Sequence, residues 1–433
     1  MTTPTDASQV SPDLTDLFRI FGRIGLMSFG GPAAQIALMH QELVEDRPWL
    51  SEKQFLNALS FCMLLPGPEA MQLATYAGWR LAGTIGGLIA GLLFVLPGAA
   101  LILALGMLYA SYGQVALVEA LFLGIKAAVI IIVLQALLKV SRKALKSRLA
   151  YGLAAVAFVG IFVFELPYPL IIVAAAGVGA LFMTGDAVPA AAPVSVRPGA
   201  TIRTAAVWAT LWLAPLLALY LVAPDSVLTQ VGLFFAKLAV VTFGGAYAVL
   251  AYMVQQVVAD YGWLTTGQMM DALGLAETTP GPLILVTEFV GFLAGAQQGG
   301  TALGVMAAIV TLWVTFVPSF LWIFVGAPYI EWISAQPRLT GALNAITAAV
   351  VGVILNLSLW FALNVLFGEV VRVPLGPVAV WTPTIGSLDL GSVVLACLAG
   401  ALLLWRKMDL LLVLPILAIA GLAWQMGFLP LFG

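Results

Sequence analysis

Charged residues are scarce in this sequence. Only 9% of its 433 residues are Asp, Glu, Lys or Arg, whereas 62% are hydrophobic. A soluble globular domain carries about 25% charged residues, so this chain cannot cover a water-facing surface of its own. We therefore expect the lipid bilayer to be its solvent.

Histidine and cysteine are nearly absent as well. One His and two Cys argue against a metal centre or a disulfide framework, and we predict no metal site and no cofactor. The net charge of −2 leaves no basic field for nucleic acid, so no nucleic-acid partner is expected. Neither the phosphate-binding pattern GxxxxGK[ST] nor the hydrolase patterns HExxH and GxSxG occur, so we predict no catalytic residues and no ATP-driven pumping.

Long apolar runs make up most of the chain. A membrane helix needs about 20 apolar residues, and strand-like alternation is absent. The sequence therefore predicts an all-α polytopic membrane protein. Its candidate spans are 14–44, 52–79, 82–111, 115–139, 149–164, 168–184, 205–223, 228–259, 266–296, 301–326, 338–367, 390–405 and 409–428.

The two halves of the chain repeat each other. Residues 29–68 and 243–282 align without a gap, and 17 of these 40 positions are identical, including polar residues such as Gln41/Gln255 and Asp46/Asp260. Unrelated apolar helices would not keep such a polar pattern in register. We infer a tandem duplication.

The number of spans predicts opposite orientations for the two repeats. Each repeat holds about six membrane segments, and the single helix at 205–223 turns the second repeat over. With the N-terminus inside, 13 of the 18 Lys and Arg lie in cytoplasmic segments, and Arg47, Lys53 and Arg372 lie outside, as the positive-inside rule requires. We expect inverted-topology repeats with a cytoplasmic N-terminus and an external C-terminus. The expected parts are a disordered tail (1–13), the first repeat (14–184), a linker loop with its connecting helix (185–227) and the second repeat (228–433).

Each repeat carries Pro-Gly-Pro inside an apolar span. Two prolines remove two N–H donors and break the helix, so new half-helices are expected to begin near Glu69 and Leu283. The first amides of a helix have no intrahelical acceptor and suit an anion. A second break is expected at Phe29-Gly30-Gly31-Pro32 and, without the proline, at Phe243-Gly244-Gly245. The alternative is that Gly and Pro merely kink or pack these helices.

Lys126 and Lys237 lie within the predicted spans, and Arg23 is the repeat partner of Lys237. Arg23 and Lys237 occupy matching positions, and Lys237 would be costly to leave unpaired in lipid; the alternative for both is snorkelling to the interface. Lys126 could contact an anion or form an ion pair with an acid such as Glu119. Near the breaks, Glu69, Glu277 and Glu288 could carry protons or cap half-helices.

Together these patterns predict a substrate-binding site at mid-membrane between the paired breaks. The expected residues are Arg23, Ser28, Phe29, Gly30, Gly31, Pro66, Gly67, Pro68, Glu69, Gln72, Lys126, Lys237, Thr242, Phe243, Gly244, Gly245, Thr279, Pro280, Gly281 and Pro282.

Four segments resemble the chromate ion transporter family, of the two-domain, long-chain type. They are FGGP (29–32), DRPWLSEKQF (46–55), LLPGPEAMQLATYAGWRLAG (64–83) and TPGPLILVTEFVGFLAG (279–295). The resemblance covers both repeats. It implies a prokaryotic cytoplasmic-membrane protein that exports chromate and confers chromate resistance, driven by the proton-motive force, with sulfate as a structural mimic.

The resulting expectation is a secondary active transporter of chromate or a sulfate-like oxyanion, with protons as the candidate coupling ion. The open alternatives are a sulfate or other anion transporter, a passive channel, and a membrane enzyme or assembly protein that holds its substrate in a duplicated cavity. The oligomeric state, including a homodimer, stays open.

Overall fold

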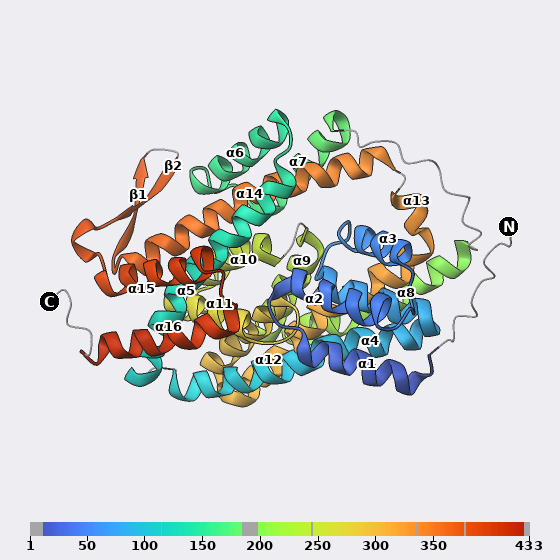
Figure 1. Ribbon diagram of the computed structural model, residues 1–433, viewed down its shortest axis with the longest axis horizontal. Coiled ribbons are helices and arrows are strands. Elements are labelled where there is room, and N and C mark those ends of the chain that lie inside the picture. Colours follow the sequence, from blue (N-terminus) through green and yellow to red (C-terminus); the bar gives the residue numbers. More distant parts are fainter. Residues whose placement is uncertain are drawn as a thin grey trace.

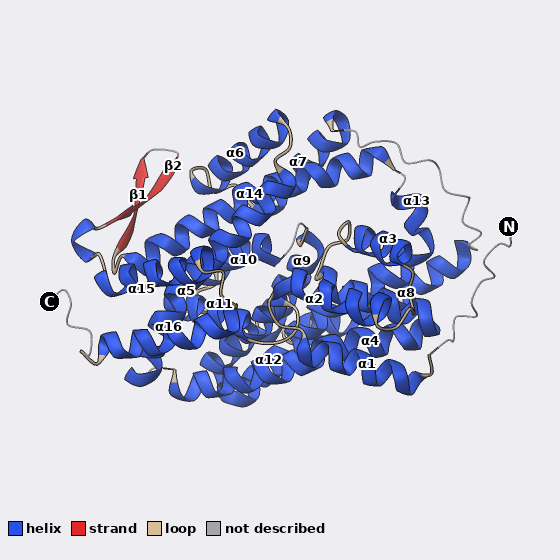
Figure 2. Cartoon of the chain, viewed as in Figure 1, coloured by secondary structure: helices blue, strands red, loops and turns tan. Residues whose placement is uncertain are grey.

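The computed structural model describes residues 12–113, 115–183, 198–243, 246–334, 336–375 and 378–427. Most of the predicted tail (1–13), much of the linker loop, and Gly244 and Gly245 lie outside these ranges. Within them the chain is helical nearly throughout (Figure 2), so the prediction of an all-α membrane protein is confirmed.

The first half contains seven helices among its described residues. They are α1 (Leu14–Met27), α2 (Gly31–His40) with the π turn η1 (Gln41–Glu45), α3 (Glu52–Cys62), α4 (Glu69–Tyr112), α5 (Ala116–Ala144), α6 (Arg148–Phe162) and α7 (Tyr168–Phe182). After residues 184–197, α8 (Pro198–Val222) leads into the second half.

The second half presents a matching series. It comprises α9 (Val227–Val241), α10 (Ala246–Gln255) with the π turn η2 (Gln256–Asp260), α11 (Thr266–Thr278), the short turn η3 (Leu283–Leu285), α12 (Val286–Gly326), η4 (Ala327–Tyr329), α13 (Ile330–Ser334), α14 (Pro337–Leu366), β1 (Val370–Leu375), β2 (Val378–Pro383), η5 (Ile385–Ser387), α15 (Leu390–Gly400) with η6 (Ala401–Trp405), and α16 (Leu410–Gln425).

Five helical stretches are long and apolar enough to cross a membrane in the part of the chain that the structure describes. They are Glu69–Tyr112, Ala116–Ala144, Pro198–Val222, Leu283–Tyr329 and Pro337–Leu366. Five shorter apolar helices accompany them.

The helices that precede Pro-Gly-Pro begin in the same way in both halves. At α3 the Ser51 hydroxyl accepts from the Gln54 amide while the Gln54 side chain accepts from the Ser51 amide. Thr265 and Gln268 form the same pair of hydrogen bonds at α11. Such a capping box satisfies two helix-end donors at once, so these helices start at fixed, matched positions.

The chain folds back on itself at the breaks instead of continuing across. The Arg23 guanidinium on α1 lies 3.4 Å from the Glu42 carboxylate beyond α2. The rings of Phe234 on α9 and Trp263 lie 5.7 Å apart, although a straight helix would carry residue 263 about 30 Å beyond the break after α9. The Gln268 and Gln297 side chains at the outer ends of α11 and the first arm of α12 likewise meet at 3.4 Å.

These contacts correct part of the predicted topology. The stretches 14–44, 228–259 and 266–296 were predicted to cross as single spans, but each is a re-entrant pair of half-helices, because the Gly and Pro breaks let the chain reverse. Arg47 shares the Glu42 carboxylate with Arg23 of α1, so it lies on the same side of the first break as α1.

The two long helices are themselves sharp hairpins. In α4 the helical geometry is interrupted at Ala82 and Gly83, and in α12 at Gly299 and Gly300. The two arms then pack antiparallel and very closely, since a Cβ on Gly78 would collide with the Gly86 carbonyl oxygen. The arm after each turn is the membrane-crossing part, as predicted for 82–111 and 301–326.

The last helices of each half pack against the other half. α6 and α7 lie along α14, whereas α15 and α16 lie along α5 (Figure 1). Glycines permit these approaches: a Cβ on Gly352 of α14 would strike the Ala154 carbonyl, and one on Gly124 of α5 would strike the Leu417 carbonyl. The two halves are thus reciprocally interlocked.

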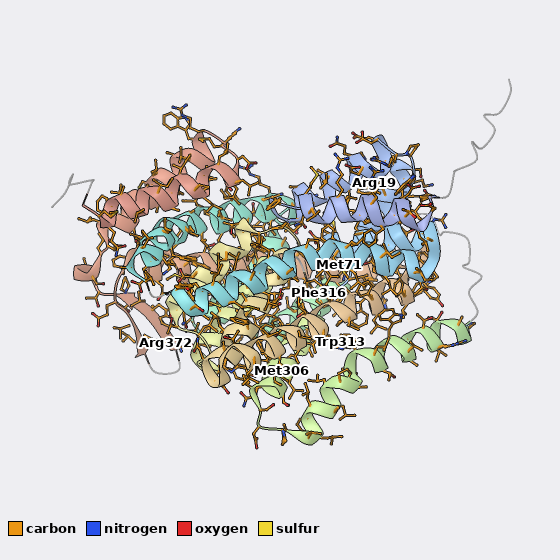
Figure 3. All side chains as sticks on the ribbon, turned by 90° about the horizontal axis from the view of Figure 1, so that it is seen from below. Arg19, Met71, Met306, Trp313, Phe316 and Arg372 are labelled. Atoms are coloured by element: carbon orange, nitrogen blue, oxygen red, sulfur yellow. The ribbon has the colours of Figure 1, made fainter. Side chains whose placement is uncertain are left out.

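One element was not predicted from the sequence, the antiparallel hairpin β1–β2 between α14 and α15, paired from Val370/Pro383 to Leu375/Val378. Arg372 on β1 forms an ion pair with Glu165 and lies over the Trp381 ring. Figure 3 shows Arg372 and Arg19 of α1 at opposite ends of the long axis.

Candidate functional site

The paired breaks are joined across the two halves by reciprocal hydrogen bonds. The Gly67 amide donates to the Thr242 carbonyl (2.9 Å), and the Gly281 amide donates to the Ser28 carbonyl (2.8 Å). Gly67 matches Gly281 and Ser28 matches Thr242 in the sequence repeat. Each Pro-Gly-Pro is therefore held by the end of the other half's first helix.

Each Pro-Gly-Pro also contacts the other half's long helix just after its internal proline. A Cβ on Gly67 would lie 2.9 Å from the Ser319 Oγ, next to Pro318 of α12. A Cβ on Gly98, next to Pro97 of α4, would strike the Pro280 carbonyl oxygen. The breaks thus meet in the middle of the fold, as the predicted site requires.

The half-helices begin where the sequence predicts. α4 starts at Glu69 and η3 at Leu283. Their first residues line one shared cavity of about 20 Å³, bounded by Pro32, Gln35, Gly67, Pro68, Glu69, Ala70, Pro282, Leu283 and Ile284. Two helix ends with free amides therefore converge on a space with room for about one water.

Two glutamines fix this centre, and the sequence reasoning found only one of them. Gln72 donates to the Pro66 carbonyl (2.7 Å). Gln35, which was missed, donates to the carbonyls of Gly281 (2.7 Å) and Ser28 (3.2 Å). Both are buried, and the Oε1 atom of each lacks a hydrogen-bond partner among the described residues. Gln35 matches Val249 in the repeat, so only its polarity within an apolar helix could have signalled it.

The predicted hydroxyl groups serve the helix ends. Ser28 donates to the Ile24 carbonyl (2.6 Å), Thr242 to that of Leu238 (2.5 Å) and Thr279 to that of Ala276 (3.3 Å). Their oxygens can still accept, but their protons are engaged. Gly30 and Gly31 take left-handed φ values of 80° and 76° at the first break, and Phe29 and Phe243 beside the breaks are half-buried.

None of the three predicted cations lines the central cavity. Arg23 pairs with Glu42, which also contacts Arg47 at 2.5 Å. Lys237 is exposed on α9, with its Nζ 5.6 Å from the Tyr252 ring centroid. Each of these two cations therefore has a partner outside the central cavity.

Lys126 belongs to a separate polar cluster. Its ammonium lies 3.0 Å from the Asp271 carboxylate, which also accepts from the Tyr109 hydroxyl at 2.6 Å. The partner is therefore Asp271 of the second half, not Glu119, which lines the same cavity of about 670 Å³. Asp271 was missed because its match in the first half is Asn57.

The three candidate proton carriers have different surroundings. Glu69 lines the central cavity. Glu277 accepts from the Tyr247 hydroxyl at 2.8 Å. Glu288 is 1% exposed, and neither carboxylate oxygen has a hydrogen-bond partner in the part of the chain that the structure describes. An ionised carboxylate in that position would be strongly destabilised.

Matched residues of the two breaks differ in burial. Residues 279–283 of the second break are all buried, whereas the matched residues 65–69 of the first are all partly exposed. α10 is buried over 249–254, but its counterpart α2 exposes Ala33, Ala34 and Ala37. Consistently, α10 packs against α14 and α11 against α5, without equally extensive packing of α2 or α3 there. The break of the first repeat is therefore the less covered of the two.

This arrangement defines a class of protein. Broken helices that meet at the centre of a polytopic helical fold are the architecture of membrane transporters. The chain matches the chromate transporter family over residues 15–180 and 229–423, and it belongs to that family, whose members are transporters and not enzymes.

Curated relatives agree. A probable chromate transport protein of Synechococcus elongatus is 34% identical over 342 residues, 79% of this chain and 82% of that protein. The chromate transport protein of Cupriavidus metallidurans is 30% identical over 358 residues (82% and 84%), and that of Pseudomonas aeruginosa is 34% identical over 360 residues (81% and 82%). No solved structure matches the chain.

Proposed function

We propose that the protein is a secondary active transporter that exports a tetrahedral oxyanion, chromate in first place, across a prokaryotic cytoplasmic membrane and so confers chromate resistance. Sulfate, a dianion of the same shape, is the expected competitor. The observation that carries the proposal is the cavity between the two Pro-Gly-Pro breaks, on which two half-helix N-termini converge. The named activity of the relatives supports the choice of anion.

The anion is bound mainly by backbone in this proposal. The amides at Glu69 and Ala70 face it from one half, and those at Leu283 and Ile284 from the other. Each helix end offers about half a positive charge, so two ends balance about one charge of a dianion. The cavity of about 20 Å³ has to widen to admit the anion, which requires the two breaks to move apart.

Alternating access follows from the duplication. We propose that the two repeats have opposite orientations, with the N-terminus in the cytoplasm and the C-terminus outside. The unequal burial of the matched breaks then represents a state open to the cytoplasm. Exchange of the two conformations between the repeats would open the site to the outside.

Protons are the proposed coupling ion, and Glu69 is the first candidate carrier. Its carboxylate shares the cavity with the anion, and like charges repel, so loading of the anion and loading of a proton on Glu69 favour each other. A dianion that moves with one proton carries one net negative charge, so a membrane potential that is negative inside drives the pair outward. Glu277 and Glu288 are the further candidates.

Transport by purified protein in liposomes tests the proposal. Labelled chromate should enter with a saturable rate, a pH gradient should drive it against its own gradient, and sulfate should compete. In Glu69→Gln the pH gradient should lose its effect while downhill exchange continues. A linear, gradient-independent flux would indicate the rival function, a passive channel, and absence of any oxyanion flux would refute the proposal.

A further inference from the structure

A second cavity, of about 680 Å³, lies between the last turns of α5 and the turn that follows η6. Four cations line it, Lys139, Arg142 and Lys143 of α5 together with Lys407, and none of its lining residues is acidic. We refer to it as the α5 basic cavity.

A hydrogen bond joins the two elements that form the α5 basic cavity, α5 and η6. Gln135 of α5 donates to the Leu403 carbonyl at 3.2 Å and ties the helix to η6. Lys407 has a φ of +52°, a left-handed conformation that costs a lysine about 1 kcal/mol or more. The fold thus sustains a strained backbone at the residue that brings the fourth cation to the cavity.

The α5 basic cavity adjoins the central site. The Lys143 ammonium lies 3.5 Å from the Met63 sulfur, and Met63 is the residue on which α3 ends before Pro-Gly-Pro. Met63 lies six residues before Glu69, which lines the cavity between the breaks. The cations therefore stand beside the partly exposed break of the first repeat.

The second repeat has no such cations at the matched positions. Gln135, Lys139 and Lys143 correspond to Asn356, Trp360 and Asn364 of α14 in the alignment that superimposes Ile125 on Ile346. These three neutral side chains line a cavity of about 240 Å³ beside α10, the counterpart of α2. The same helix face therefore occurs in both repeats, but it is cationic only on α5. That face lies beside the partly exposed break of the first repeat.

We propose that the α5 basic cavity collects the oxyanion on the side of the first repeat and passes it to the break at Gly67. This inference rests on the proposed function and adds an entry site to it. The ligand is a tetrahedral dianion, for which clustered ammonium and guanidinium groups supply charge and donors. A phosphate headgroup of an anionic lipid offers similar chemistry, and the experiment separates the two sources.

The test is Lys139→Gln/Lys143→Gln in liposomes of phosphatidylcholine, with chromate presented on the side of the first repeat. We expect the apparent KM to rise about tenfold at low salt, at about threefold per lysine, with little change in the maximal rate. The difference should shrink at 0.5 M salt because screening removes steering. Lys139→Arg/Lys143→Arg should restore the KM, which separates charge from folding.

The matched control is Lys146→Gln/Arg406→Gln. It removes two cations at the same end of these helices, but neither lines the cavity. Its KM should equal that of the wild type. An equal rise in both double variants would assign the effect to the general positive charge of that side and overturn the inference, as would an unchanged KM in Lys139→Gln/Lys143→Gln.

The lipid arm repeats the measurement with phosphatidylglycerol. If the cavity holds a lipid phosphate, the wild-type rate will depend on this lipid, the variant will lose that dependence, and its chromate KM will be normal; this result overturns the inference. If the wild type transports no oxyanion, the proposed function fails. Binding of labelled sulfate to the purified wild type and variant then tests anion binding by the α5 basic cavity separately from transport. Equal binding refutes the inference, and weaker binding to the variant supports it.

Discussion

Gly67 combines a left-handed φ with close neighbours in both halves, and its replacement by alanine gives the sharpest expectation. Gly67 has a φ of +118°, and an added Cβ would lie 2.8 Å from the Gln72 Nε2 and 2.9 Å from the Ser319 Oγ. Backbone strain at such a φ costs about 1–3 kcal/mol. Displacement of Gln72 from the Pro66 carbonyl adds about 1 kcal/mol.

The substitution therefore destabilises the conformation in which the two breaks meet by about 2–4 kcal/mol in total. Because 1.4 kcal/mol is a factor of ten, chromate transport by Gly67→Ala should drop at least tenfold. The amount of protein in the membrane should stay near that of the wild type, since the strain is local. Initial uptake rates in vesicles, normalised to the inserted protein, measure this.

Two further substitutions calibrate the result. Gly281→Ala meets a similar φ of +93°, but its nearest neighbour is the flexible end of Leu285 at 2.9 Å, so a smaller loss is expected. Gly152→Ala on α6 meets nothing within 4 Å and should transport normally. Wild-type rates in Gly67→Ala would refute the reasoning that places the anion at this break.

Three more predictions rest on other contacts. In a background with Cys62→Ala and Cys397→Ala, a membrane-impermeant thiol reagent should label Ala37→Cys and spare the matched Ala251→Cys, whose native residue is 6% exposed; equal labelling would contradict the one-sided access. Lys126→Gln should lower the melting temperature in detergent, since a broken buried ion pair costs about 3–5 kcal/mol. Adding Asp271→Asn should recover much of the loss. Strictly additive losses would show that Lys126 and Asp271 do not stabilise each other. Gln35→Ala should weaken anion binding two- to tenfold, measured with labelled sulfate, and unchanged affinity would make Gln35 purely structural.

The fold was predictable wherever residue type constrains the backbone. Proline fixes where a helix must stop, so the starts at Glu69 and Leu283 followed from Pro-Gly-Pro alone. The direction of the chain after a break depends on tertiary contacts such as Arg23–Glu42 and Phe234–Trp263, which hydropathy does not contain. The re-entrant pairs were therefore read as crossings.

The candidate site was predictable to the extent that it repeats. Gly67/Gly281 and Ser28/Thr242 are matched in sequence, and in space the Gly67 amide bonds the Thr242 carbonyl while the Gly281 amide bonds the Ser28 carbonyl. Gln35 and Asp271 have apolar or uncharged counterparts, so comparison of the halves could not select them. The emphasis on Lys237 came from the cost of a charge in lipid, but the structure places its ammonium over the Tyr252 ring and not at the central cavity.

The exchange of terminal helices between the halves bears on how the chain is made. α6 and α7 emerge from the ribosome long before α14, the helix that they cover. Until α14 is made, their apolar faces must contact lipid, the insertion machinery or a non-native helix. A single repeat produced alone would keep that unmet surface together with the Gly67 amide, whose acceptor lies in the other half. Such a half-length chain could complete its structure only by pairing with a second one, so assembly and function would become concentration-dependent. Joining both halves in one polypeptide removes that dependence.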